Sequence, residues 1–125
     1  MTARILAAAW AAVLACTLVA CGGSSKPDRQ TSGGAHPGLT IEVTIANGQV
    51  TPTNATLQAK VKEQITLRIT SDVTDELHVH SVPDHKFEIA AAPNQTFQFS
   101  VDVPGNVDVE LHHLKRTIAT IQVQP

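Results

Sequence analysis

The chain has 125 residues, 42% of them hydrophobic, and a formal net charge of −2 at pH 7. This length and hydrophobic content suit one folded domain, and the lack of a basic excess excludes nucleic acid as an expected partner. Both cysteines, Cys16 and Cys21, fall near the N-terminus, so we expect no disulfide to stabilise the rest of the chain.

Residues 1–20 have the pattern of a secretory signal peptide. Arg4 precedes an apolar run, residues 5–19, which ends in small residues. A run of about fifteen residues is shorter than the roughly twenty that cross a bilayer, so we favour a signal over a transmembrane anchor. The segment Leu18-Val19-Ala20-Cys21 resembles the lipobox of bacterial lipoproteins. This resemblance implies that Cys21 is the first mature residue, carries acyl chains and anchors the domain to the extracytoplasmic side of the cell membrane.

Residues 21–38 begin with this cysteine and continue in a run rich in Gly, Ser and Pro. The run has no apolar side chain larger than alanine or proline, so it cannot bury enough surface to offset the entropy of ordering. We therefore predict a flexible tether and a solvated His36 within it. Without Arg4, the mature chain has eight basic and eleven acidic residues, a net charge of −3.

From residue 39 onward, apolar and polar residues alternate, which is typical of β-strands with one buried face. The alternation runs through residues 39–45, 65–70, 86–89, 97–103, 107–111 and 117–123. Turn-forming residues such as Asn47-Gly48 and Pro104-Gly105 fall between these runs. Seven or eight short strands in ~87 residues predict an all-β domain over residues 39–125, a small antiparallel Greek-key sandwich or barrel.

Two segments of this domain resemble a known family. Residues 71–80, SDVTDELHVH, and residues 104–112, PGNVDVELH, resemble the cupredoxin-like domains of bacterial exported lipoproteins. The resemblance implies a cupredoxin-like fold over nearly the whole stretch from residue 39 to 125. It also places His78 at the histidine of a central strand, and His112 and His113 near the start of the loop that carries the remaining copper ligands in that family.

The sequence departs from this family at the copper site. A blue-copper centre needs a thiolate, two imidazoles and usually an axial methionine. Residues 22–125 contain neither cysteine nor methionine, and Leu111 occupies the position of the family's cysteine, counted from Pro104. Composition therefore excludes blue-copper electron transfer.

The histidines still form a candidate metal site. His78 and His80 share one face of a strand with Cβ atoms about 7 Å apart, a separation from which two imidazoles can reach one ion over bonds of about 2.0 Å. Glu76 shares this face, and either His112 or His113 can join from the second segment if the two segments meet at one end of the sandwich. We predict a site of His78, His80 and His112, which suits Cu(II) on affinity order and Zn(II) less well.

The same histidines have a second interpretation. Each imidazole is then an ordinary strand residue, exposed or paired with a nearby carboxylate, and the domain is a metal-free interaction or structural module with an unidentified envelope partner. We also expect His85, beside a turn, to be solvated. The acidic residues Asp72, Asp75, Glu76 and Asp84 are expected to form a solvated rim, because their spacing does not match a calcium loop.

No enzyme motif accompanies these residues. The tripeptide His-Val-His also occurs in copper-zinc superoxide dismutases, but their two-metal site needs more histidines than the five outside the tether, in a longer barrel. A nucleophile elbow, a phosphate-binding glycine loop and a carboxylate pair placed for acid-base work are all missing. We therefore expect a binding protein and no enzymatic activity.

Overall fold

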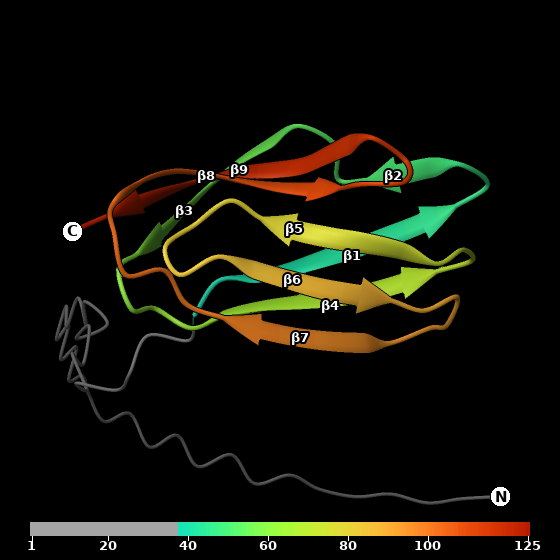
Figure 1. Cartoon of the computed structure of the whole chain (residues 1–125), viewed down its shortest axis with the longest axis horizontal. Coiled ribbons are helices and arrows are strands. Elements are labelled where there is room, and N and C mark those ends of the chain that lie inside the picture. Colours follow the sequence, from blue (N-terminus) through green and yellow to red (C-terminus); the bar gives the residue numbers. More distant parts are fainter. Residues whose placement is uncertain (1–37) are drawn as a thin grey trace, which may run out of the picture. The chain divides into compact units, whose positions relative to one another are not determined.

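The computed structural model describes residues 38–125, so the predictions for the signal peptide, Cys21 and His36 fall outside it. No helix that could cross a membrane occurs in the described range. These residues form nine strands (Figure 1): β1 (Thr40–Ala46), β2 (Gln49–Thr51), β3 (Ala55–Lys60), β4 (Ile65–Ser71), β5 (Asp75–Val79), β6 (His85–Ile89), β7 (Gln95–Phe99), β8 (Gly105–Leu111) and β9 (Arg116–Gln124).

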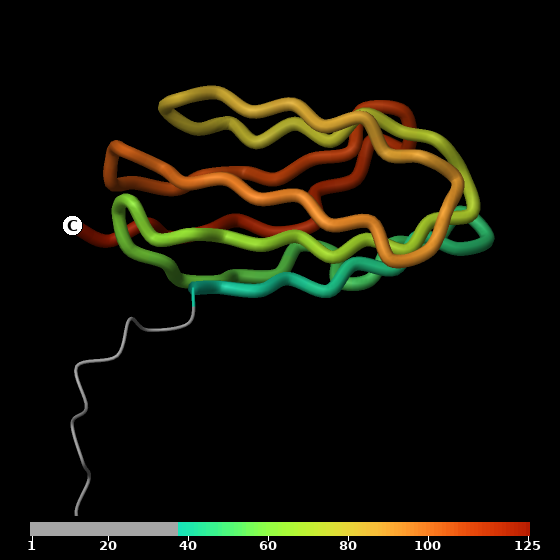
Figure 2. The backbone as a smooth tube through the Cα atoms, turned by 90° about the horizontal axis from the view of Figure 1, so that it is seen from below, coloured from blue at the N-terminus to red at the C-terminus, as the bar shows by residue number. Residues whose placement is uncertain are grey.

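The strands build two sheets that enclose one core. One sheet has the order β2-β1-β4-β7, and the other has the order β3-β9-β8-β5-β6. In Figure 2, β5 and β6 (yellow to gold) lie at one side of the domain, and β1 and β4 (teal to green) lie at the other. The prediction of an all-β sandwich is confirmed. The prediction that it is antiparallel is correct for most strand pairs, but β1 pairs with β4, and β3 with β9, in parallel.

The core is filled by alternate residues of the strands, as a period-two pattern requires. The largest fully buried side chains are those of Ile45, Ile65, Leu67, Ile69, Leu77, Leu111, Ile118 and Ile121. In β5 the buried residues Asp75, Leu77 and Val79 fix the strand's orientation. The intervening residues Glu76 and His78 therefore point to the outer face of the five-stranded sheet.

Some strand predictions differ from the structure. β2 and β3 were not indicated by the alternation, and Ala59 is the one residue of β3 that belongs to the buried core. The strand expected over residues 97–103 ends at Phe99. Val101 is fully buried beyond it, whereas Val103, next to Pro104, is 49% exposed.

The edge strands β6 and β7 meet at one side of the sandwich through aromatic side chains. The ring centroid of Phe87 lies 5.1 Å from that of Phe97 and 6.3 Å from that of Phe99. His85 extends this aromatic row, with its centroid 5.4 Å from Phe99 and its Nε2 atom 3.0 Å from the carbonyl oxygen of Ser100. The prediction that His85 is solvated is wrong, because its ring is partly buried in this seam between the sheets.

Candidate metal-binding site

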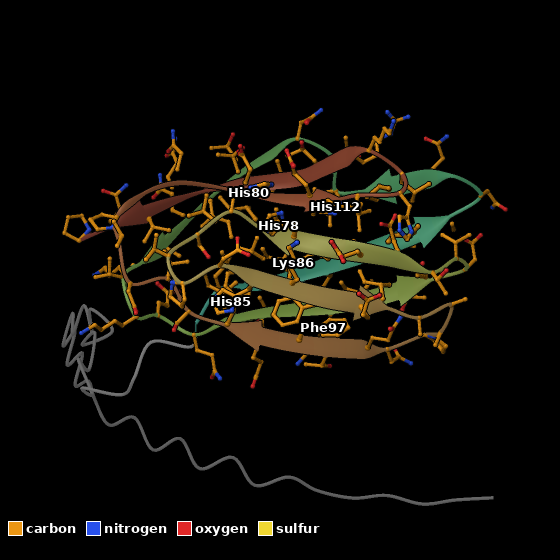
Figure 3. All side chains as sticks on the ribbon, viewed as in Figure 1. His78, His80, His85, Lys86, Phe97 and His112 are labelled. Atoms are coloured by element: carbon orange, nitrogen blue, oxygen red, sulfur yellow. The ribbon has the colours of Figure 1, made fainter. Side chains whose placement is uncertain are left out.

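Three histidines gather on the outer face of the five-stranded sheet (Figure 3). His78 belongs to β5, His80 follows β5 directly, and His112 follows β8 directly. The ring centroid of His78 lies 4.0 Å from that of His80 and 5.2 Å from that of His112. The structure thus brings the three candidate ligands together, on the face of a sheet and not at an end of the sandwich.

The pairing of β5 with β8 explains this arrangement. His78 lies directly opposite Glu110, between apolar pairs that point into the core. The backbone N–H of His112 donates to the carbonyl oxygen of Glu76 over 2.9 Å, which continues the contact one residue beyond the end of β8. His112 therefore stays beside β5 although its own strand has ended.

Each of the three imidazoles is paired with a carboxylate. The nitrogen–oxygen distances are 2.6 Å for His78 Nε2 and Asp84, 2.7 Å for His112 Nδ1 and Glu76, and 2.9 Å for His80 Nε2 and Glu110. An ionised carboxylate only accepts hydrogen bonds, so the ring nitrogen that faces it carries the proton. In a neutral ring the second nitrogen then keeps its lone pair for another partner.

The second nitrogens of His78 and His112 face each other. The Nδ1 atom of His78 lies 3.3 Å from the Nε2 atom of His112. Two lone pairs at this distance repel unless a proton or a cation lies between them. Two metal–nitrogen bonds of ~2.05 Å that span this separation enclose an angle of about 107°, close to the tetrahedral value. A carboxylate behind each imidazole is also what metal-binding histidines usually have, because it fixes the tautomer and the ring orientation.

His80 and His113 are placed differently. The Nε2 atom of His80 is engaged by Glu110, and its ring is tilted 44° to that of His78. The side chain of His113 is 68% exposed, and its Nδ1 atom lies 3.8 Å from Asp75. Within residues 38–125, no group of three or more His, Cys, Asp or Glu side chains is arranged to hold a metal ion. The facing pair therefore offers two nitrogen ligands, and further positions on an ion would be filled from solvent or another molecule.

The outer face around the histidines carries many acidic side chains. They are Glu76, Asp84, Glu88, Asp108 and Glu110, and Lys86 lies among them. The hydrogen bond from His78 lowers the pKa of Asp84 below its ordinary value of 3.8, and the charges of His78, Lys86 and His80 lower it further, while burial opposes the shift. Asp84 thus stays ionised at neutral pH and can orient His78. Clustered negative charge also raises the local concentration of cations.

Asp75 is buried, so the prediction that it belongs to a solvated rim is wrong. The residue is 1% exposed. Its carboxylate accepts hydrogen bonds from the backbone N–H groups of Glu76, His113 and Leu114, at 2.7, 2.9 and 3.1 Å. Sequence reasoning missed this role, although a signal was present: Asp75 is two residues before the inward-facing Leu77, and alternation places it on the same side.

The chain matches no protein-family model and no curated protein. Its backbone is similar to that of auracyanin B, with 12% identity, coverage of 74% of this chain and 93% of that chain, and a TM-score of 0.52. A dithionite-reduced auracyanin from Roseiflexus castenholzii has 11% identity, coverage of 74% and 100%, and a TM-score of 0.51. The fold is cupredoxin-like. An amicyanin mutant with Cu(I) also matches, with 16% identity, coverage of 74% and 88%, and a TM-score of 0.48.

The cupredoxin-like fold does not by itself assign a function, since one fold hosts many sites. A thiolate–imidazole–thioether copper centre does not fit the described part of the chain, because residues 38–125 contain no cysteine and no methionine. Leu111, at the position expected for the family's cysteine, is 1% exposed and belongs to the core. Any metal chemistry of the described residues is therefore left to imidazoles and carboxylates, without a sulfur ligand.

Proposed function

We propose that this protein is a lipid-anchored, extracytoplasmic binding protein for a transition-metal ion, which it holds through His78 Nδ1 and His112 Nε2. The observation that carries the proposal is the 3.3 Å separation of these two nitrogens, on rings whose other nitrogens contact Asp84 and Glu76. A divalent cation between the two lone pairs turns their repulsion into coordination. The acidic surroundings add to the attraction for such an ion.

Copper(II) is the proposed ion, and zinc is the second candidate. Nitrogen sites bind Cu(II) most tightly among the divalent first-row ions. The 3.3 Å separation fits a tetrahedral ion as it stands. Square-planar Cu(II) needs neighbouring nitrogens about 2.9 Å apart. The side chain of His112 is 38% exposed, so a small ring movement of roughly 0.4 Å can supply this geometry.

The proposed activity is binding and release of the ion, not electron transfer or catalysis. Without a thiolate, the site lacks the ligand that tunes fast copper redox chemistry. Two protein ligands on an open sheet face leave the ion accessible to exchange. We therefore favour capture, buffering or delivery of a metal at the cell surface, with an envelope protein as the recipient.

The anchoring part of the proposal rests on the segment Leu18–Cys21. We expect the wild-type chain to incorporate labelled palmitate and to fractionate with membranes when it is produced in a bacterium that processes lipoproteins. Cys21→Ala should abolish the labelling. An unlabelled wild-type protein in the soluble fraction would refute the anchor and leave the metal proposal untouched.

The metal part is tested by calorimetric titration of residues 22–125 with Cu(II) and Zn(II). We expect wild-type binding with a Kd below about 1 μM and a loss of about tenfold or more in His78→Ala and in His112→Ala. His85→Ala is the matched control, because this histidine lies in the seam with Phe99 and away from the pair. Equal binding by the wild type and both ligand variants would refute the site. His80→Ala shows whether the third candidate ligand contributes.

A metal-free interaction module is the second candidate function. It is favoured by an apolar patch at the turns next to β5 and β8, where Val82 is 59% exposed and Val103 is 49% exposed. Both line a hollow of about 190 Å³ together with His80 and Pro104. No measurable binding of either metal by the wild-type protein would favour this function.

A further inference from the structure

We propose that Asp75 is a positioning residue of the metal site, which holds His112 opposite His78 by fixing the turn after β8 to β5. This inference rests on the proposed function of the two imidazoles. It assigns a role to a side chain that touches neither candidate ligand nitrogen.

Both oxygens of the buried Asp75 carboxylate accept hydrogen bonds from backbone N–H groups. Its side chain is 0% exposed. Oδ1 accepts hydrogen bonds from the N–H groups of Glu76 and His113, and Oδ2 accepts one from the N–H of Leu114. A carboxylate is the side chain that can accept all of these bonds at once without presenting a donor.

Three consecutive amides of the turn are thereby bound to two consecutive residues of β5. The N–H of His112 donates to the carbonyl oxygen of Glu76, and the next two amides, those of His113 and Leu114, donate to Asp75. The ring of His112 makes a fourth contact through Nδ1 and the Glu76 carboxylate. The backbone position of His112 relative to β5 is thus set on both sides of its Cα atom.

This attachment determines the metal site because the second ligand, His78, lies on the same strand three residues after Asp75. A site that is loose by about 1 Å loses much of its affinity, since binding must then pay for ordering the ligands.

The position of Asp75 also argues for a specific role. It is the inward-facing position of β5 before Leu77, where an apolar side chain would avoid the cost of desolvating a carboxylate. An apolar side chain could not hold the turn.

The test compares Asp75→Asn with Asp72→Asn in the lipid-free mature chain. Asp72 is the matched control, since its Oδ2 accepts one backbone hydrogen bond, from Asn47 at 2.8 Å, at an exposed turn. We expect Asp75→Asn to raise the Kd for Cu(II) about tenfold or more, as loss of outer support does at metal sites, and to reduce the number of nitrogen ligands seen by electron paramagnetic resonance. Asp72→Asn should match the wild type in both measurements.

The result that would overturn the inference is a folded Asp75→Asn variant with the wild-type Kd and the wild-type spectrum. Circular dichroism and the Tm establish folding at the assay temperature. A wild-type protein that binds no metal would refute the proposed function instead, so the two failures are distinguishable.

A second measurement needs no variant and applies even where Asp75→Asn does not fold. Because coupling between binding and local structure is reciprocal, Zn(II) should slow hydrogen exchange at the amides of His113 and Leu114 in the wild-type protein. The amide of Asn47, bound to Asp72, is the internal control and should not change. Metal binding that leaves exchange at His113 and Leu114 unchanged would contradict the role of Asp75.

Discussion

Glu76→Gln tests whether the carboxylates behind the imidazoles support metal binding. Glu76 contacts Nδ1 of His112 at 2.7 Å, and this contact leaves Nε2 as the free nitrogen. Glutamine has nearly the same shape but no charge, and its amide group can also rotate to present a donor. The substitution therefore weakens the control over the tautomer and the basicity of His112 while leaving both ligand rings in place.

The expected effect can be estimated from the exposure of the pair. Loss of an outer carboxylate typically costs about 10- to 100-fold in metal affinity. The side chain of Glu76 is 27% exposed and that of His112 is 38% exposed, so water can partly replace the lost contact. We therefore expect the lower end of the range, about tenfold in Kd or about 1.4 kcal/mol. The ion pair of Glu76 with Lys86, at 3.9 Å, is exposed and should add little.

The assay is calorimetric titration with Cu(II) at low and moderate ionic strength, with Glu88→Gln as the matched control. Glu88 lies opposite Glu76 in the β5–β6 pairing and is exposed on the same sheet. Its substitution removes the same charge without touching an imidazole. Equal losses of affinity in Glu76→Gln and Glu88→Gln would refute the reasoning, because the carboxylate would then act only through its charge.

Three further predictions concern pH and stability. Nuclear magnetic resonance should give Asp84 a pKa below 3.8 that rises in His78→Ala, and an unchanged pKa in the variant would contradict the hydrogen bond. Because the pKa of Asp84 is lowered in the folded state, the contribution of this pair to stability is present above the unfolded-state pKa. It is lost as the pH falls through the folded-state pKa. Leu77→Ala should lower the free energy of unfolding in urea by about 2–5 kcal/mol, since Leu77 is 0% exposed, and a loss well under that range would show that the core collapses around the cavity. Gly48→Ala should cost about 1 kcal/mol through its φ of +73° alone, because a Cβ atom there meets nothing within 4 Å, and an unchanged Tm would contradict this.

Period-two patterning predicts the strands that bury one face, and it fails where that face is small. β1 and β4 each bury large aliphatic side chains at alternate positions, so their existence follows from the sequence. β3 has one fully buried residue, Ala59, and is held mainly by its pairing with β9. Alternation also says nothing about which strands are neighbours, so the parallel pairs could not be predicted from it.

In the candidate site, too, local spacing predicts some features and long-range pairing decides the others. That His78 and Glu76 share a face follows from their spacing on one strand. The distance between His78 and His112 depends on the register of β5 and β8, which joins residues 34 positions apart. The contact of His78 with Asp84 depends on the path of the loop between β5 and β6. These long-range features decide which nitrogens are free, and no local pattern contains them.

The interior position of β9 in its sheet has a consequence for biosynthesis. β9 lies between β3 and β8, so the five-stranded sheet is incomplete until residues 116–124 have been synthesised and can insert between strands that are far apart in the chain. Folds built from such distant pairings form slowly. Slow folding of this kind would suit the export proposed above, because a translocation channel takes its cargo unfolded.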